Sequence, residues 1–574
     1  MGKKEKIFLG AMAMAAAFAL FFYLNLPTMK ETVIRFPSTY KEKDVTLEAS
    51  AWKVPDAEYA VLICPGFSCD RQKWRPFANL FVSNGYTTMV VDYAGQGASS
   101  SAIGFDNAKT DAIPVEIDDA VEQLHRWSGI AYDHIVLMSH SMGGRAVLRL
   151  LHDYNDPNAE TTVQKKEIRN VILFSPEVNY SFNAQASLFA GTSDDVEEPW
   201  ASYDENDITG TNVYIYGSTA DDIVSDENIL AIGAHLGAAD LPESGVFAGE
   251  RENGNGSRIT IGITPGVLHS YQMYSAAFAD FANAALSDLS GTEATYPSRK
   301  MNLIYVGWAL ALLGVGFFLS GMTSQEKSST ADAVPELLDA KRFLVRKFLL
   351  WIPGLIAAFL ICCIAVVLPF GSPVMNTPYM CCIAGYGLIM LLAYRKGRFP
   401  GTEGKLPSLR YRSGADGMQE AKNSMKDRIS AVVIACLVCF FVWYVLRSSM
   451  YRLIPLNARL FWVTFAGILM SMGYFVSGCE SDMLQRSGAG LHVRIIYNLI
   501  QYVALFLLVM FYLVIGSYSG LIAQVQNMIL MYIFCIPLGR YLSQHLNSRF
   551  IGAFVTGFLF QTLMITSSAL IALF

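Results

Sequence analysis

The hydrophobic positions follow two different patterns along the chain. Between about residues 45 and 285, short apolar runs typical of buried strands alternate with helical patterns of spaced apolar positions. At the N-terminus and after residue 300, the runs lengthen to about 18 residues or more, which is enough for a helix to cross a bilayer. The sequence therefore predicts an α/β domain joined to an all-α polytopic transmembrane bundle.

Nine apolar runs reach the length of a membrane span. The first, at residues 7–24, follows three lysines and has no clear cleavage site after it, so we expect an uncleaved signal anchor rather than a removable signal peptide. The other eight runs cover residues 303–322, 348–370, 379–394, 429–446, 460–476, 495–515, 521–538 and 550–574. We predict an anchor at residues 1–26, an α/β domain at 27–300 and an eight-helix transmembrane domain at 301–574.

Charge distinguishes the two parts of the chain. Residues 25–300 carry 19 Lys and Arg against 38 Asp and Glu, whereas the remaining residues carry 24 against 11. If the N-terminus is cytoplasmic, the cytoplasmic loops hold 18 Lys and Arg and the external loops only three, Arg447, Arg452 and Arg459. We therefore expect a multi-pass protein of the cell membrane with an extracytoplasmic α/β domain, which has the lipid bilayer and not nucleic acid as its partner.

Ser141 stands where a strand pattern turns into a helix pattern. The apolar run 134–138 precedes the segment Ser139-His140-Ser141-Met142-Gly143-Gly144, and a helical pattern follows from residue 145. A serine on such a turn is the nucleophile of a G-x-S-x-G elbow, in which small neighbours let strand and helix approach closely. Here Ser139 replaces the first glycine. The alternative is a serine in an ordinary strand-to-helix loop.

Two further strand ends complete a family pattern. The run 59–64 leads into Pro65-Gly66-Phe67-Ser68, and the run 88–91 leads into Asp92-Tyr93-Ala94-Gly95-Gln96-Gly97-Ala98-Ser99. Over about residues 45–285 the chain resembles the α/β-hydrolase superfamily, in particular its monoglyceride-lipase and serine-aminopeptidase-like branch. The resemblance implies a mostly parallel eight-stranded sheet with helices on both faces. It also implies that the amides of Phe67 and Met142 form an oxyanion hole.

The same resemblance requires an acid and then a histidine after the serine. The family places its acid after the strand at 212–217, where the preferred residue is Asp221. Asp222 stays open because one extra residue blurs the register, and Glu177 stays open because some members place the acid after the preceding strand. His269 follows the last predicted strand, at 259–263, and is the only histidine that does so.

These residues predict a serine hydrolase. His269 accepts the proton of Ser141, the acid orients the imidazole, and an acyl-enzyme forms and is hydrolysed. This chemistry needs no metal or organic cofactor, and we expect a small-molecule ester, lipid or peptide as the substrate. Two other interpretations remain: a non-catalytic ectodomain that regulates or receives substrate for a transporter, and an acyltransferase that uses the same triad.

Three further features complete the sequence predictions. Residues 179–211 correspond to the cap of the superfamily and are short, so we expect an open site. Cys64 and Cys69 flank the loop that contains Phe67, and they either form a disulfide or stay free. Glu480 and Asp482 fall at a span end and are predicted to be loop residues, so the membrane part is expected to act as a scaffold or to present substrate and not to transport.

Overall fold

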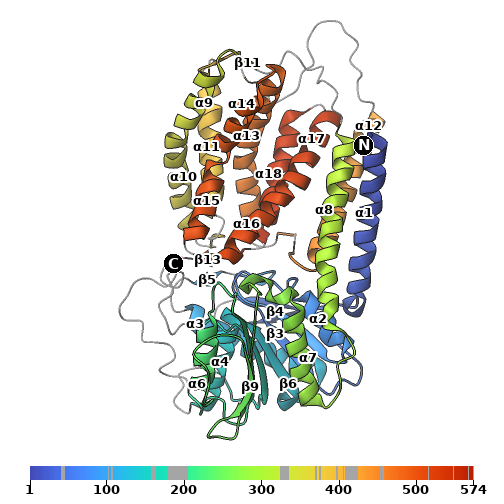
Figure 1. Cartoon of the computed structure of the whole chain (residues 1–574), viewed down its shortest axis with the longest axis vertical. Coiled ribbons are helices and arrows are strands. Elements are labelled where there is room, and N and C mark those ends of the chain that lie inside the picture. Colours follow the sequence, from blue (N-terminus) through green and yellow to red (C-terminus); the bar gives the residue numbers. More distant parts are fainter. Residues whose placement is uncertain are drawn as a thin grey trace.

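The computed structural model describes the chain except for residues 41–44, 101, 105–107, 157–162, 179–203, 324–334, 369–370, 374–376, 396–398, 405, 407–424, 453, 456–457, 515, 547, 567 and 573–574. The described residues form a sheet flanked by helices below and a bundle of long helices above (Figure 1). We call the first the α/β half, from β1 to α7 (residues 32–290), and the second the helical half, which comprises α1 and the elements from α8 onward.

The sheet of the α/β half has nine described strands in the order β1-β2-β4-β3-β6-β7-β8-β10-β9. The six strands from β4 to β10 in this order are parallel, whereas β1, β2 and β9 are antiparallel to their neighbours. The strand bounds are β1 Thr32–Pro37, β2 Thr46–Trp52, β3 Ala60–Cys64, β4 Thr87–Asp92, β6 Ile135–His140, β7 Asn170–Phe174, β8 Asn212–Ser218, β9 Phe247–Glu252 and β10 Arg258–Thr264.

The ninth strand is the difference from the predicted eight. β9 has the sequence FAGERE and alternates between half-buried and exposed positions at the sheet edge. It has no apolar run, so the pattern that predicts buried strands does not detect it. The central strands do have such runs, and every residue of β3, β4, β6 and β7 is buried.

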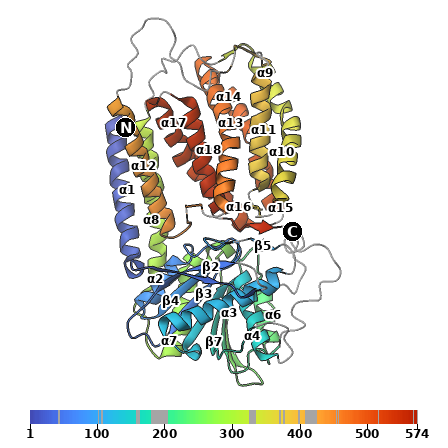
Figure 2. The ribbon, with the colours of Figure 1, turned by 180° about the vertical axis from the view of Figure 1, so that it is seen from behind.

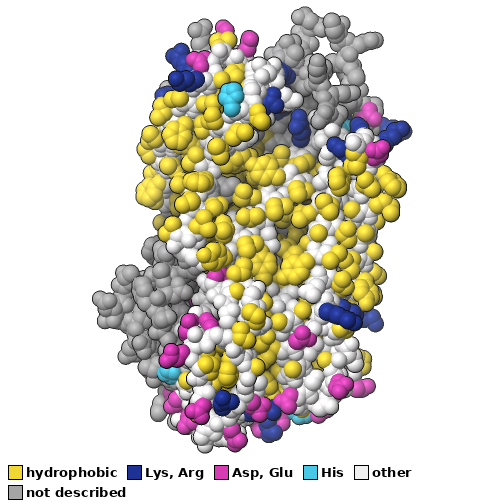
Figure 3. Space-filling view, in the orientation of Figure 1, with side chains coloured by type: hydrophobic (Ala, Val, Ile, Leu, Met, Phe, Trp, Pro, Cys, Tyr) yellow, Lys and Arg dark blue, Asp and Glu magenta, His cyan; other side chains and the backbone are white. Residues whose placement is uncertain are grey.

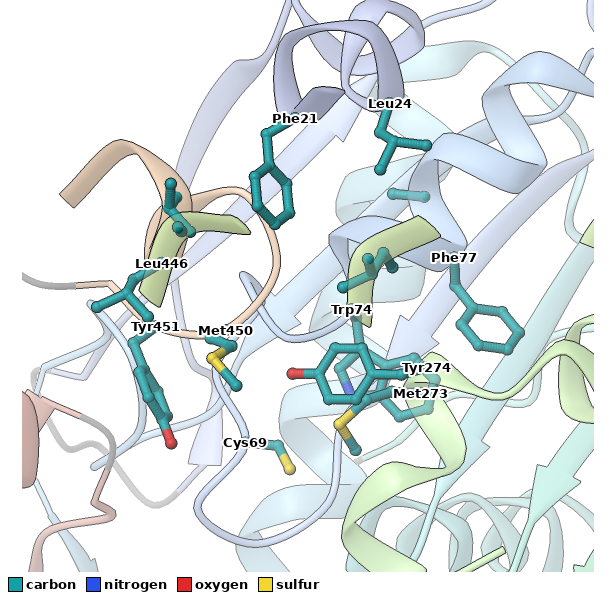
Figure 4. Close-up of a cluster of buried hydrophobic side chains, with 14 of the residues drawn as sticks. Phe21, Leu24, Cys69, Trp74, Phe77, Met273, Tyr274, Leu446, Met450 and Tyr451 are labelled. Atoms are coloured by element: carbon teal, nitrogen blue, oxygen red, sulfur yellow. The ribbon is translucent and has the colours of Figure 1, made fainter. Parts of the chain in front are cut away.

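Helices cover both faces of the sheet, as predicted. Alternate residues of β3 point to opposite faces: Val61 and Ile63 pack in one core with α2 (Arg75–Ser83) and α7 (Ala276–Ser290). Leu62 packs in the other core with α3 (Ala108–Ser128), α4 (Met142–Asn155) and α6 (Asp226–His235). The core on the α2 and α7 side continues into the helical half through Phe21 and Leu446 (Figure 4).

The helical half contains twelve described α-helices, several of which join into longer segments. Their bounds are α1 Lys3–Leu24, α8 Asn302–Met322, α9 Ala340–Leu349, α10 Trp351–Val366, α11 Thr377–Arg395, α12 Met425–Arg447, α13 Ala458–Arg486, α14 Leu491–Gln501, α15 Val503–Val514, α16 Tyr518–Leu530, α17 Ile536–His545 and α18 Arg549–Thr566. α1 packs along α8, where Gly10 and Gly314 allow close contact: a Cβ on Gly10 would lie 2.4 Å from the Phe318 nitrogen.

Eight helical segments among the described residues are long and apolar enough to cross a membrane. A ninth exists if the pair Leu491–Gln501 and Phe506–Val514, bent by 65°, counts as one span. This pair falls where the run at residues 495–515 predicted one membrane span. Hydrophobic side chains cover much of the outer surface of the helical half, and charged side chains gather at its far end and on the α/β half (Figure 3).

The end of the chain departs from the predicted span at 550–574. α18 stops at Thr566, and β13 (Ile571–Ala572) pairs in parallel with β5 (Ile103–Gly104) of the α/β half. The amide of Leu570 also donates to the carbonyl of Gly95 at 2.9 Å. A short apolar run at a chain end fits a buried strand as well as a helix. A prediction from hydropathy alone therefore extended the span beyond the true end of the helix.

Glu480 is the second correction, since it was predicted to be a loop residue. α13 continues to Arg486, and Glu480 lies inside it with 1% of its surface exposed. Its carboxylate accepts hydrogen bonds from Lys347 Nζ at 2.6 Å and from the hydroxyls of Tyr394 and Tyr497 at 3.0 Å each. A helix can continue beyond the end of its apolar run where a buried charge is paired. Hydropathy contains no information on such pairing.

The three arginines that break the charge rule lie at the contact between the halves. Arg447 pairs with Glu31 at 3.3 Å, and Arg452 pairs with Glu48 at 2.8 Å. Arg459 donates from Nη2 to the carbonyl of Gly95 at 2.6 Å. The α/β half thus binds the helical half at the end that contains these arginines, beneath α8, α12 and α16 (Figure 2).

Candidate active site

Ser141 lies on a strained turn between β6 and α4. Its backbone has φ 54° and ψ −123°, a conformation that residues other than glycine rarely adopt. Space around the turn is minimal, since a Cβ on Gly143 would lie 2.3 Å from the carbonyl oxygen of Cys64. Ser139 fits the place of the usual first glycine, and its hydroxyl donates to the carbonyl of Ile172 at 3.4 Å. The turn therefore projects the Ser141 hydroxyl above the sheet.

The structure brings His269 together with Asp221. His269 Nδ1 lies 2.8 Å from Oδ2 and 3.0 Å from Oδ1 of Asp221. Asp221 follows β8, and His269 begins the 3₁₀ helix η4 (His269–Tyr274), which follows β10. The amides of Ile223 and Val224 each donate to Asp221 Oδ1 at 2.9 Å. These bonds fix the carboxylate, and the carboxylate fixes the imidazole.

The two alternative acids have other positions. Both oxygens of the Asp222 carboxylate accept from Ser519 of α16, from the amide at 2.6 Å and from the hydroxyl at 2.5 Å. Glu177 is held through its backbone, since its amide donates to the carbonyl of Ser141 at 2.9 Å. Neither carboxylate has a described hydrogen bond to His269, although both raise its pKa electrostatically.

Opposing effects set the charge of the pair. Burial lowers the pKa of His269, but the Asp221 carboxylate outweighs it, so the pKa lies above the ordinary value for histidine. Burial raises the pKa of Asp221, but His269 and the two loop amides outweigh it, so the pKa lies below the ordinary value for aspartate. Each partner thus favours the charged form of the other, as a base that must carry a proton transiently requires.

Of the predicted oxyanion donors, Met142 directly follows Ser141, and Phe67 belongs to a loop that touches the elbow. Met142 is the first residue of α4, where backbone amides have no partner within the helix. The loop of Phe67 follows β3 and touches the elbow: a Cβ on the preceding residue, Gly66, would lie 2.9 Å from the Cβ of Ser141. Cys64 and Cys69 at the two ends of this loop are free thiols.

Two residues of the site have no counterpart in the sequence predictions. Gln272 Nε2 donates to Asp221 Oδ2 at 2.7 Å and to the Ser175 hydroxyl at 2.8 Å. The ring of His140 lies between those of Trp74 and His269, with centroid distances of 5.4 and 4.6 Å. A polar residue one turn after the predicted base is the signal that could have identified Gln272, whereas nothing in the sequence indicates the stacking of His140.

Ser141 and His269 are both buried. Ser141 is 6% and His269 4% exposed. Part of the cover comes from the helical half, because the Ser519 hydroxyl accepts from the amide of Ser270 at 3.2 Å and the amide of Ala569 donates to the Ser68 hydroxyl at 3.1 Å. Most of the predicted cap, residues 179–203, lies outside the described residues.

In the described part of the chain, no three His, Cys, Asp or Glu side chains are placed to hold a metal ion.

Part of the α/β half is similar to a known protein family. Residues 55–198 match the family model described as serine aminopeptidase, S33. No curated protein matches the sequence.

Similar solved structures include three esterases. The Pyrococcus furiosus esterase Pf2001 is 15% identical, with a TM-score of 0.32 over 46% of this chain and 93% of that one. Esterase Est2 of Thermogutta terrifontis is 17% identical, with a TM-score of 0.31 over 46% and 93%. Carboxylesterase Cest-2923 of Lactobacillus plantarum is 13% identical, with a TM-score of 0.31 over 49% and 95%. At this distance the likeness assigns no activity. The strand order is that of an α/β-hydrolase fold, and residues 55–198 within it are similar to the serine aminopeptidase family.

Proposed function

We propose that this protein is a membrane-anchored serine hydrolase that cleaves ester or amide bonds through an acyl-enzyme. The observation that carries the proposal is the buried His269–Asp221 pair, at 2.8 Å. The His269 ring lies 4.6 Å from that of His140, the residue before the strained Ser141. Strain and buried charge both destabilise a fold. The strained serine and the buried aspartate and histidine each follow a strand of a hydrolase fold, which supports catalysis and not a binding role.

The first chemical step follows from the tautomer of His269. Its Nδ1–H donates to Asp221, which leaves the lone pair of Nε2 to accept the proton of the Ser141 hydroxyl. The Ser141 oxygen then bonds to the carbonyl carbon of the substrate. The raised pKa of His269 favours this proton uptake, because the imidazolium forms next to a carboxylate.

The oxyanion and the leaving group complete the cycle. The amides of Phe67 and Met142 would donate to the carbonyl oxygen as negative charge develops on it, which is usually the largest electrostatic contribution in acyl transfer. His269 returns its proton to the departing alcohol or amine. Water, deprotonated by His269, then releases the acid and regenerates Ser141.

We also propose a topology for the protein. The helical half spans the cell membrane, the N-terminus lies in the cytoplasm and the hydrolase fold lies outside. The distribution of 18 Lys and Arg against three supports this orientation. The three exceptions do not weaken it, since Arg447 and Arg452 pair with Glu31 and Glu48 and Arg459 binds backbone carbonyls at the contact between the halves.

A fluorophosphonate probe tests nucleophile and orientation together. Intact cells that express the full chain should label with a membrane-impermeant probe at Ser141, and Ser141→Ala should abolish the label. Ser139→Ala is the matched control, because that hydroxyl lies within the same elbow but bonds the Ile172 carbonyl, so this variant should still label. Label that persists in Ser141→Ala would contradict the mechanism. Label that appears only in lysed cells would contradict the orientation.

A further inference from the structure

A cavity lies within the helical half, between α8, α12 and α16. Its volume is about 100 Å³, where roughly 10–15 Å³ is enough to hold one water-sized group. Among the described residues that line it, Gln526 is the only one whose side chain is neither apolar nor aromatic. A pocket with this lining excludes water and favours hydrocarbon.

The cavity is elongated along the helices. Its lining on one side runs from Gln526 to Phe534, and on another from Trp308 to Val315. At about 1.5 Å per residue, the longer stretch extends about 12 Å. Both stretches belong to segments that are apolar enough to cross a membrane. The apolar lining therefore extends roughly parallel to the helices, which suits a hydrocarbon chain.

One end of the cavity contacts the segment that contains His269. The 3₁₀ helix η4 packs against α16. Its Tyr274 ring meets the cavity residue Trp308 edge-on, with ring centroids 4.9 Å apart. Its Tyr271 side chain hydrogen-bonds that of Gln526, the polar residue of the lining. The cavity lining thus contacts the residues two and five positions after His269, the proposed general base.

The same end of the cavity also adjoins the loop of Phe67. Tyr451 lines the cavity, and the Lys73 ammonium lies 5.7 Å from the centre of its ring. Lys73 in turn donates to the carbonyl of Ser68 at 2.8 Å, next to the proposed oxyanion donor. Tyr451 and Met450 of the cavity join Cys69, Met273 and Tyr274 in one buried cluster (Figure 4).

We infer that the substrate is a long-chain acyl lipid of the membrane, whose acyl chain occupies this cavity while its carbonyl carbon reaches Ser141. The inference rests on the proposed function and adds the substrate class. The Ser141 oxygen bonds to the acyl carbon, the bond to the lipid alcohol or amine breaks, and that group leaves with the proton from His269. Water then cleaves the acyl-enzyme and releases a fatty acid. The helical half presents the acyl chain to the hydrolase fold.

Two adjacent leucines of α8 provide a matched test. Leu312 lines the cavity, whereas Leu313 is 55% exposed on the outer surface of the helix. The full chain in detergent is assayed with p-nitrophenyl laurate and p-nitrophenyl butyrate. Each buried methylene is worth roughly fourfold in affinity. Leu312→Trp should therefore lower kcat/KM for laurate roughly tenfold or more and leave butyrate within about twofold, and Leu313→Trp should change neither.

The outcomes separate this inference from the proposed function. Unchanged laurate hydrolysis in a folded Leu312→Trp variant, or equal losses on both esters, would overturn the cavity site. Butyrate hydrolysis that persists in Ser141→Ala would instead overturn the proposed function.

A second measurement needs no cavity variant. A palmitic acid analogue with a terminal diazirine should photolabel the wild-type protein within residues 526–534. Label found only on the outer surface, around Leu313, would count against the inference.

Discussion

The Asp222 carboxylate binds the first turn of a helix almost three hundred residues further along the chain. It accepts the Ser519 amide at 2.6 Å and the Ser519 hydroxyl at 2.5 Å. Asp222 directly follows Asp221, the partner of His269. The loop that holds the proposed acid is therefore attached on one side to the imidazole and on the other to α16 of the helical half. A carboxylate at a helix N-terminus is also electrostatically favourable.

These two adjacent aspartates should respond differently to substitution. Asp221→Asn should lower kcat by about 10⁴-fold, because the amide cannot hold the imidazole in the tautomer that accepts the serine proton. Asp222→Ala should lower the free energy of unfolding by about 1–3 kcal/mol, from the lost bonds to Ser519, and retain most of kcat. Ester hydrolysis and thermal melting of the two variants check both expectations. Equal losses of kcat would contradict the assignment of the acid.

The pH profile should respond to the charges around His269. Catalysis needs this imidazole neutral, so kcat/KM should fall as the pH drops through its pKa, which lies above 6.5 because Asp221 outweighs the effect of burial. Glu177 also raises this pKa. Glu177→Gln should therefore move the acidic limb of the profile to lower pH.

Glu167→Gln is the control for this shift, since that carboxylate lies on the exposed surface and 2.5 Å from Arg169. The measurement is kcat/KM for a short-chain ester between pH 5 and 9. A limb that stays in place in Glu177→Gln, or moves upward, would argue against His269 as the titrating base.

Glu48 provides a test of the contact between the halves. Its carboxylate pairs with buried Arg71, with Arg452 of the helical half at 2.8 Å and with Arg35 at 2.8 Å, whose side chain is 66% exposed. Arg71→Ala should cost about 3–5 kcal/mol of unfolding free energy, because it leaves buried carboxylates uncompensated. Arg35→Ala should cost at most about 1 kcal/mol, since solvent screens that pair.

The acid stability of the same contact follows from Glu48. Burial raises its pKa, but the arginines outweigh burial and lower the pKa to about 2. The contribution of Glu48 is therefore complete above its unfolded value of about 4.5 and is lost as the pH falls towards 2. Thermal melting in detergent at a series of pH values checks this. A wild-type protein whose acid sensitivity matches that of Glu48→Gln would contradict it.

The Lys347–Glu480 pair predicts a characteristic double-mutant result. Both side chains are 1% exposed, and they lie 2.6 Å apart between helices. Lys347→Met alone should destabilise the protein by about 3–5 kcal/mol, because Glu480 is left buried without its cation. Replacing both residues by apolar ones should recover most of this loss. Melting temperatures of the single and double variants test this expectation. A double variant as unstable as Lys347→Met would contradict it and indicate a role for the charges beyond packing.

The sequence predicted the parts of this fold that depend on local pattern. The buried strands β3 and β6 and the elbow at Ser141 each have a continuous signal of apolar residues or small side chains. β9 lacks an apolar run, so it was missed. The choice between Asp221 and Asp222 depended on a one-residue register, which only the hydrogen bonds of the loop to Ile223 and Val224 distinguish.

The remaining features depend on contacts between distant segments. Glu480 within α13 and Ser519 over the site are fixed by partners far away in the chain. Hydropathy reports average transfer into an apolar environment and contains no information on such pairs. The helical half also contacts segments next to the site through Ser519 and Ala569, which no local pattern indicates.

Trapping of the acyl-enzyme tests the central claim most directly. The purified full chain is mixed with p-nitrophenyl acetate, quenched in acid within the burst phase and digested for mass spectrometry. We predict a burst of p-nitrophenolate close to one per protein molecule and an acetyl group on Ser141. No adduct should form in Ser141→Ala. An acetyl group on another residue that persists in this variant, or turnover without any covalent adduct, would contradict the account.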